Sequence, residues 1–384
     1  MAMLERKFMN LSVSDLIVVD GLLKIAASKK IARLLQLRHG GKWHDDDPYV
    51  PQALISKLRL REGQYINGHA VMDTSSRGMR LIHVDAVDGL PVEQRRNCLP
   101  FSRATILSPM EQIKLESEGM PMSTRVIDLF APIGRGQRCL VVAPPKAGKT
   151  ILLQQIAKGI AANYPDFHLM TLLVDERPEE VTDFRRNAPV EIFASSNDDS
   201  TKDHLEVANL AFLHAQHLVE AGKHVVLLLD SLTRLARAYN SSSARGGKIM
   251  SGGLDSQALE KPRQLFALAR NTEEIGSLTI VATILVETGS RMDDIIFQEF
   301  KGTGNCEIVL DRKIAEKRIF PAVNLYATGT RREELLLSAE ALEVSRIFRR
   351  AFAGSRPDVA METILNRMAK SETNEEFIQL INIR

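Results

Sequence analysis

The pattern of apolar and polar positions divides the chain into two parts of different texture. In the second part, near-continuously apolar runs alternate with longer segments of helical periodicity. The runs are RCLVVA, LMTLLVDE, HVVLLLDS and LTIVATILVE, and the segments between them include TILLQQIAKGIAANY and DHLEVANLAFLHAQHLVEAG. Strands that are buried on both faces read as continuous apolar runs, so the alternation predicts an α/β fold, with a parallel sheet covered by helices on both faces.

The first part of the chain has a different pattern. Residues from about 45 to 87 contain short β-rich runs such as YINGHAV and RLIHVDAV, separated by glycines, which predict a small antiparallel domain or barrel. Residues 1–44 show mixed helical periodicity and predict a helical segment. Charged residues 88–125 are expected to form a connector to a large domain over 126–384, and a length of 384 residues agrees with two domains.

The amino-acid composition limits the classes of protein to which the chain could belong. The apolar fraction is 44%, as in ordinary globular proteins, and the net charge of +2 means that any contact with nucleic acid must come from local basic patches. The cysteines Cys98, Cys139 and Cys306 show neither disulfide nor metal-ligand spacing. No apolar run approaches the length of a membrane span, so we expect a soluble cytoplasmic protein.

The stretch VVAPPKAGKT, residues 141–150, predicts a phosphate-binding loop between a strand and a helix. Ala143 stands where the usual P-loop pattern has its first glycine. Lys149 is expected to reach the β- and γ-phosphates of ATP, and Thr150 to hold Mg²⁺. The other residues expected to bind the nucleotide here are Lys146, Ala147, Gly148 and Ile151.

Two acidic residues follow predicted strands at the edge where such folds bind ligands. Asp230 ends VVLLLD and is expected to hold Mg²⁺ through water. Glu176 ends LLVDE and is a candidate for orienting and deprotonating the attacking water, although it could instead cap the next helix or pair with Arg177. Arg318 and Arg331 are both candidates for an arginine finger supplied by a neighbouring subunit.

Two glycine-rich loops, residues 241–256 and 287–294, each carry one cation among small residues. The cations are Lys248 and Arg291. Such loops are suited to gripping a phosphate backbone, and the alternative is a flexible surface loop without a ligand.

Residues from about 124 to 354 closely resemble the transcription termination factor Rho family, whose members are hexameric RNA-dependent ATPases with a RecA-like core. The resemblance lies in DLFAPIGRGQRCLVVAPPKAGKT, LLVDERPEEVTDFRR, LLLDSLTRLARAYN, FKGTGNCEIVLDRKIAEKRIFPA and TGTRREELL. Rho proteins characteristically write their P-loop as APPKAGKT, so Ala143 is a feature of the family.

The resemblance also implies roles for residues at matching positions. It makes Glu176 the catalytic carboxylate with Arg177 beside it, places Phe320 on the adenine, and favours Arg331 as the finger. The implied RNA-contacting channel loops are Lys248, Ile249 and Met250, and Thr288, Gly289, Ser290 and Arg291. Rho usually has lysine where Arg291 stands, so the cation is retained. The implied partners are single-stranded RNA, RNA polymerase and other copies of the chain in a homohexamer.

The first part of the chain departs from the family. It is similar to the second half of Rho's oligonucleotide-binding barrel, a reduced OB-fold of the cold-shock type, but the usual Gly-Phe-Gly-Phe stretch is replaced by LLQLRHGGKWH. Base stacking on aromatic side chains supplies about 1 to 3 kcal/mol per base. Trp43 and Tyr49 are the nearby aromatic candidates, with Arg59 and Arg61 as phosphate contacts. We therefore expect weakened or altered primary RNA binding with the motor retained.

The function that these features indicate is an ATP-dependent RNA translocase and helicase that pulls RNA and terminates transcription. Two alternatives remain at this point. One is a rotary or secretion-type ATPase subunit, which shares the core but not the RNA stimulation. The other is a non-catalytic regulatory relative of Rho, against which the intact set of P-loop and acidic residues argues.

Overall fold

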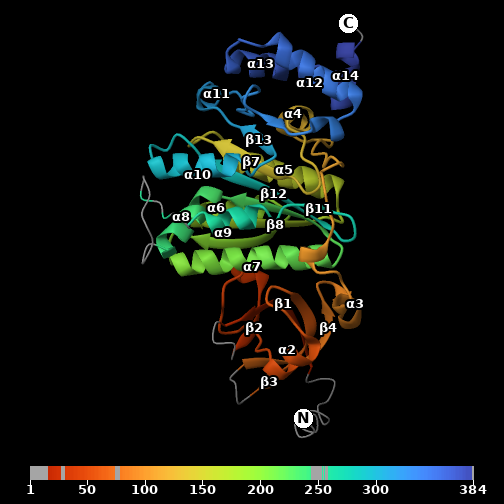
Figure 1. Cartoon of the computed structure of the whole chain (residues 1–384), viewed down its shortest axis with the longest axis vertical. Helices are drawn as coiled ribbons and strands as arrows, with labels where there is room; N and C mark the ends of the chain where they lie inside the picture. The colour runs from red at the N-terminus through yellow and green to blue at the C-terminus, as the bar shows by residue number, and fades with distance from the viewer. Residues whose placement is uncertain are drawn as a thin grey trace.

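The computed structural model describes residues 16–26, 31–73, 78–243, 253, 255 and 258–382. It contains a small β-barrel, a central sheet with helices on both faces, and a group of helices near the C-terminal end of the described chain (Figure 1). Helix α7, Thr201–Glu220, lies between the central sheet and the barrel. Within the described ranges, no helix combines the length and the apolar character that crossing a membrane requires.

The central sheet has seven strands in the order β14-β13-β7-β12-β10-β8-β9. Every neighbouring pair is parallel except β13 and β14 at one edge. The strands are β7 Arg138–Ala143, β8 His168–Glu176, β9 Glu191–Ser196, β10 His224–Asp230, β12 Ser277–Leu285, β13 Cys306–Val309 and β14 Gly329–Thr330. The four apolar runs of the sequence form β7, β8, β10 and β12, as predicted.

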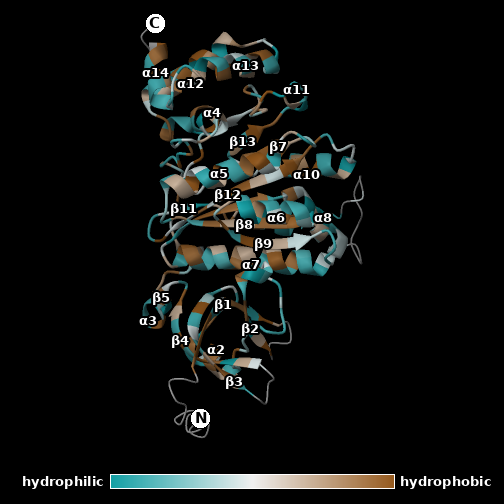
Figure 2. Cartoon of the chain, turned by 180° about the vertical axis from the view of Figure 1, so that it is seen from behind, coloured by the Kyte–Doolittle hydropathy of each residue, from teal (hydrophilic) through white to brown (hydrophobic). Residues whose placement is uncertain are grey.

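Helices cover both faces of this sheet. Successive strand residues point alternately into two hydrophobic cores, one on each face. Val141 packs into one core and Val142 into the other. One core receives α4 Met122–Phe130, α5 Lys149–Asn163, α6 Pro178–Asn187, α11 Arg312–Glu316, α12 Ala339–Ala351, α13 Pro357–Met368 and α14 Asn374–Asn382. The other receives α7, α8 Leu232–Ser243, α9 Glu260–Phe266 and α10 Arg291–Lys301. The sheet strands are mostly hydrophobic in colour, whereas the helices also carry hydrophilic faces (Figure 2).

The barrel is built from an antiparallel sheet in the order β2-β1-β3-β4-β5. Its strands are β1 Ile17–Ile25, β2 Ala32–Leu35, β3 Tyr65–Asp73, β4 Gly78–Val87 and β5 Leu90–Pro91. Tyr49 closes the sheet into a barrel, because it bridges antiparallel to Arg33 of β2 and parallel to Arg80 of β4. Helix α2, Gln52–Leu58, follows and contributes Ile55 to the barrel core.

The expected helical segment over 1–44 is wrong where the chain is described, since β1 and β2 are strands. Gly21 gives a physical reason. Its φ of +153° is one that residues with a side chain rarely adopt, and a Cβ there would lie 2.7 Å from the Leu35 carbonyl oxygen. Val19 and Leu23 of β1 point into the barrel core. The barrel is therefore not reduced to residues 45–87, because the strands before residue 45 complete it.

The segment 88–125, expected as a connector, fixes the barrel to the large α/β domain. It contains α3 Val92–Arg96, a short 3₁₀ helix at Phe101–Arg103, strand β6 Ile106–Leu107 and the start of α4. Strand β6 pairs with β11, Asn271–Thr272, of the large domain. The buried Arg95 of α3 binds Asp88 beside the barrel and Glu220 at the end of α7, each at 2.7 Å.

Candidate nucleotide site

The predicted phosphate-binding loop joins β7 to α5, in the strand-to-helix context that such a loop requires. Lys146 and Gly148 both adopt positive φ, of 66° and 92°. Successive amides in such a turn converge on a point, and the free N–H groups of the first turn of α5 add a favourable dipole for an anion. Gly148 faces the Phe320 ring, with 3.8 Å between a Cβ placed on the glycine and the nearest ring carbon.

The side chain of Lys149 contacts both predicted acidic residues, Asp230 and Glu176. Its Nζ is 2.7 Å from both carboxylate oxygens of Asp230 and 3.2 Å from Oε1 of Glu176. Burial lowers the pKa of Lys149, but the charges of Asp230 and Glu176 outweigh burial and raise it. The lysine is therefore held in its charged form where phosphates would arrive.

Glu176 is aimed into this cluster by an irregularity at the end of β8. The register between β8 and β9 shifts between Val174 and Glu176, and Asp175 takes a φ of 54°. A bulge of this kind redirects the following side chain. Glu176 is only 3% exposed, and burial together with the charge of Asp230 raises its pKa to about 7, although Lys149 opposes the shift.

Asp230 and Thr150 present oxygen atoms next to one another. The Asp230 carboxylate accepts a hydrogen bond of 2.6 Å from the hydroxyl of Thr283 on β12, and Thr150 Oγ1 lies 3.5 Å from Asp230 Oδ2. Carboxylate and hydroxyl oxygens are the ligands that Mg²⁺ prefers, so this donor set fits the ion.

Arg234, which was not singled out from the sequence, also belongs to the cluster. It extends from the first turn of α8, donates a hydrogen bond of 2.8 Å to Asp175, and lies 3.4 Å from Glu176 Oε1. Glu176 thus contacts Lys149 and Arg234, whereas Arg177 is exposed at the N-cap of α6. The signal was available, because LLLDSLTRLARAYN places arginine four residues after Asp230, one helical turn into the next element.

Phe320 lies beside the loop and is half exposed. It lines a pocket of about 320 Å³ together with Ala147, Gly148 and Ile151. Ile151 is itself 61% exposed, which leaves an apolar surface next to the phosphate loop. Arg318, the other finger candidate, is exposed and lies two residues before Phe320 in the sequence.

Arg331 lies near the amino ends of the sheet strands, whereas the phosphate loop lies at their carboxyl ends. Its N–H donates to the carbonyl of Asn305, which directly precedes β13, and the Asn305 side chain in turn accepts from the N–H of Arg138 at the start of β7. The P-loop begins beyond Ala143 at the other end of β7. Six strand residues span roughly 20 Å, so the exposed Arg331 cannot reach the phosphate loop of its own chain.

Of the two predicted RNA loops, Lys248, Ile249 and Met250 lie outside the described residues. Thr288, Gly289 and Ser290 lead into α10, which begins at the exposed Arg291. The Thr288 hydroxyl donates to Asp293, at 2.6 Å, and so does Arg237 of α8, at 2.6 and 2.8 Å. Arg237 and the fully buried Asp293 therefore tie this loop to the helix that follows Asp230, a link that the sequence analysis did not anticipate.

The predicted barrel residues are dispersed. Tyr49 is half-buried on the strand segment that closes the barrel, and Arg59 is exposed at the end of α2. Arg61 binds Glu220 of α7, which is an interdomain contact. Trp43 is 41% exposed and lies under the guanidinium of Arg33, 5.5 Å from the ring centre.

Residues 123–328 match the ATP synthase alpha/beta family, nucleotide-binding domain. Over 97% of its length the chain is 44% identical to the transcription termination factor Rho of Aquifex aeolicus, of which it covers 86%. Over 87% of its length it is 48% identical to the transcription termination factor Rho of Streptomyces lividans. The chain spans about half the length of the Streptomyces lividans and Micrococcus luteus relatives.

Solved structures of secretion ATPases share the fold. A prototypical ATPase from the type III secretion system of pathogenic bacteria matches with a TM-score of 0.57 and 26% identity, over 65% of this chain and 70% of that one. The assembled ATPase EscN from the enteropathogenic E. coli type III secretion system matches with a TM-score of 0.59 and 24% identity, over 71% of each chain. The latter likeness concerns the fold alone.

Proposed function

The chain belongs to the transcription termination factor Rho family, and on that basis we propose that it is an ATP-dependent RNA translocase and helicase that terminates transcription. It would act in the cytoplasm as a homohexameric ring on single-stranded RNA, with RNA polymerase as its target. The observation that carries the proposal is the convergence of Lys149, Asp230 and Glu176 at the carboxyl ends of β7, β10 and β8.

In the proposed mechanism, the amides of residues 146–150 and the Lys149 ammonium hold the phosphates of ATP. Phe320 and Ile151 supply the apolar surface for the adenine, a role supported by the pocket that they line next to Gly148. Entry of the phosphates separates Lys149 from the carboxylates, since the ammonium then has phosphate oxygens to bind.

Glu176 orients the attacking water and accepts its proton. A general base is most effective when its pKa lies near the working pH, and burial next to Asp230 raises the pKa of Glu176 to about 7. Arg234 holds the carboxylate in place through its contact with Oε1. Thr150 and Asp230 would hold Mg²⁺, which when bound neutralises charge on the phosphates.

Arg331 serves a neighbouring subunit as the arginine finger. The support is positional, because Arg331 is exposed at the edge of the sheet opposite to the phosphate loop of its own chain. In a closed ring with head-to-tail contacts, one edge of each subunit faces the other edge of the next. Arg177 is exposed beside Glu176 and is a second cation near the phosphates.

RNA would be held at two places, the barrel and the loops around Lys248 and Arg291. Coupling between RNA and ATP has a physical route in the second loop, because Arg237 and Asp293 connect Thr288 to the helix that follows Asp230. A loop that moves on binding RNA would therefore shift α8, which also carries Arg234.

The test is ATP hydrolysis by the full chain with and without a cytidine-rich single-stranded RNA, at a fixed salt concentration because phosphate contacts are salt-sensitive. We expect strong stimulation by RNA. Glu176→Gln should abolish turnover while ATP binding persists, and Glu179→Gln, on the exposed first turn of α6, is the matched control. Hydrolysis that ignores RNA would favour an ATPase of the secretion type, and the absence of hydrolysis would favour a regulatory relative.

A further inference from the structure

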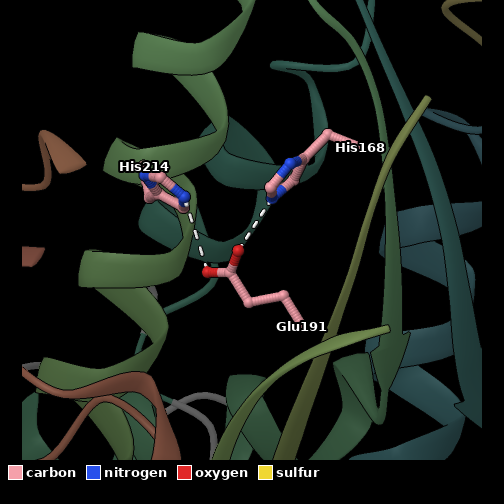
Figure 3. Close-up of side chains that lie close together, drawn as sticks. All are labelled: His168, Glu191 and His214. Atoms are coloured by element: carbon pink, nitrogen blue, oxygen red, sulfur yellow. Dashed lines mark hydrogen bonds and ion pairs between the residues drawn. The ribbon is translucent and has the colours of Figure 1, made fainter. Parts of the chain in front are cut away.

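A cluster of two histidines and one carboxylate lies where the ATPase domain meets the barrel, apart from the nucleotide site (Figure 3). His168 is the first residue of β8, Glu191 is the first residue of the neighbouring β9, and His214 comes from α7, which packs on both strands. One ring nitrogen or carboxylate oxygen from each residue lies within 4.8 Å of those of the other two. The three side chains converge although they are far apart in sequence.

The two contacts of Glu191 differ in kind. His168 Nε2 lies 2.8 Å from Oε2, an ordinary hydrogen bond. His214 Nε2 lies 3.4 Å from Oε1, and neither of these two buried atoms has a hydrogen-bond partner among the residues that the structure describes. His214 is 1% exposed, so water does not satisfy its nitrogen from outside. Buried polar atoms without a partner are uncommon and call for an explanation.

The hydrogen bond made by the other nitrogen of His214 indicates which ring nitrogen carries the proton. Its Nδ1 lies 3.1 Å from the carbonyl oxygen of Gly63, in the barrel. A carbonyl can only accept, so Nδ1 carries a proton, and in a neutral ring Nε2 then presents a lone pair. That lone pair faces the Glu191 oxygen, and two acceptors face each other unless a cation lies between them. Histidines that bind metal through one nitrogen typically donate the other N–H to a carbonyl or carboxylate.

We propose that His168, Glu191 and His214 form a binding site for a divalent transition metal ion, Zn²⁺ in particular. Two imidazoles and one carboxylate are an established ligand set for zinc, with water as the fourth ligand. Bonds of about 2.0 to 2.1 Å in a tetrahedron place ligand atoms about 3.3 Å apart. The candidate ligand atoms of the cluster lie within 4.8 Å of one another. His168 keeps 32% of its side chain exposed and leaves a route for the ion and its water.

Because His214 also holds the Gly63 carbonyl, the metal would fasten the barrel to β8 and β9. Gly63 must be glycine there, since its φ is +85° and a Cβ would lie 2.7 Å from Leu213 Cβ.

The test is calorimetric titration of ZnCl₂ into the full chain after treatment with a chelator, in the absence of nucleotide. We expect one tight equivalent per chain and a higher melting temperature with zinc. His168→Gln should weaken binding by more than about 100-fold, because even an outer partner of a ligand changes affinity by about 10- to 100-fold. Co²⁺ in place of zinc should give the visible absorption of a tetrahedral site in the wild type and lose it in the variant.

His83→Gln is the matched control, because His83 is an exposed histidine that also contacts a carboxylate, Asp85. It should leave the tight equivalent unchanged. His168 is the ligand chosen for substitution because it is the most exposed of the three, and circular dichroism would verify that the variant folds. Absence of a tight equivalent, or equal affinity in wild type and His168→Gln, would overturn the proposal. A wild type that binds no zinc while its His214 ring stays doubly protonated would identify a proton-bridged pair instead.

Discussion

Lys149 Nζ and the carboxylate of Asp230 are 2.7 Å apart although 81 positions separate the two residues in the sequence. Lys149 follows β7, Asp230 ends β10, and β12 lies between these strands. Carboxyl ends of parallel strands meet at one edge of a sheet, which is where ligands bind in such folds. The contact therefore joins the cation proposed for phosphates to the acid proposed for the metal ion.

Lys149→Ala should reduce ATP hydrolysis by about 100-fold or more, because loss of one donor to developing charge costs about 10² to 10³ in rate. The substitution also leaves Asp230 and Glu176 without their shared cation, so nucleotide affinity should fall as well. Steady-state hydrolysis and fluorescent nucleotide binding measure the two effects. Lys158→Ala, on an exposed position of α5, should leave both unchanged; hydrolysis that survives Lys149→Ala would remove the lysine from the proposed mechanism.

The pH dependence of hydrolysis should report Glu176. Its pKa is raised to about 7 by burial and by the charge of Asp230. A protonated carboxyl cannot accept a proton, so kcat/KM for ATP should rise about tenfold per pH unit below pH 7 and level off above it. A rate profile that is flat from pH 5 to 8 would contradict the role of Glu176 as base.

The same pKa has a consequence for stability with a definite sign. Between the ordinary carboxyl value and about 7, the folded state keeps a proton that the unfolded state releases. The free energy of unfolding should therefore fall as the pH rises through this window. Glu176→Gln cannot titrate and should lose this dependence, which urea unfolding at several pH values would measure in the absence of nucleotide.

The parts of this molecule that follow local rules were predictable from the sequence. Apolar runs predicted four of the seven strands of the central sheet, β7, β8, β10 and β12, because burial on both faces demands such runs. The strand-to-helix context of residues 141–150 predicted the loop between β7 and α5. The position of Glu176 at the end of a strand was predicted, and its catalytic role stays a prediction. The bulge at Asp175 that directs the Glu176 side chain was not predicted, since a positive φ at an aspartate leaves no periodic pattern in the sequence.

Other features depend on contacts between distant residues and were missed for that reason. The strands β1 and β2 read as helical because apolar positions in β1 are spaced unevenly around Gly21, and their pairing partners lie up to about 50 residues away. His168, Glu191 and His214 carry no spacing signal because a strand start, a neighbouring strand start and a helix bring them together. The contact of Arg61 with Glu220 was missed for the same reason, and an RNA contact of Arg61 stays a prediction.

A mixture of two inactive variants should recover activity if Arg331 acts across subunits. Arg331→Ala rings lack the finger and Lys149→Ala rings lack the phosphate lysine, so each alone should be inactive. In randomly mixed rings, about a quarter of the interfaces combine an intact Lys149 with an intact Arg331 from the neighbour. Hydrolysis after co-assembly should therefore exceed that of either variant; no recovery in rings shown to be mixed would place the finger elsewhere, with Arg318 the next candidate.

Glu220→Ala should destabilise the junction of the two domains by about 3 to 5 kcal/mol, the usual effect of removing one partner of a buried ion pair. Glu220 and Arg95 are each only 5% exposed, and the variant would remove one of the two carboxylates, Asp88 and Glu220, that bind the Arg95 guanidinium. Urea unfolding is the measurement, with Glu362→Ala on α13 as a control outside the network. If Glu220→Ala and the wild type have the same free energy of unfolding, the Glu220–Arg95 ion pair contributes no more stability than the alanine that replaces it.

Acid should act on the same junction. Burial raises the pKa of Glu220, but His217, Arg61 and Arg95 more than offset burial and hold the pKa well below its usual range. A depressed pKa contributes stability that is present above the unfolded value and is lost as the pH falls. Wild type should therefore lose stability in acid more steeply than Glu220→Ala does.

Tyr49→Ala should weaken binding of single-stranded RNA by the full chain, because this aromatic ring lies on the strand segment that closes the barrel. Stacking of one base contributes about 1 to 3 kcal/mol, or roughly 5- to 150-fold in affinity. Fluorescence anisotropy with a labelled cytidine-rich oligonucleotide at fixed salt measures the change. Tyr49→Phe keeps the ring and should retain the affinity. If Tyr49→Ala binds as tightly as the wild type, the barrel face around Tyr49 is not the loading site. The loops proposed around Lys248 and Arg291 would then be the next RNA contacts to test.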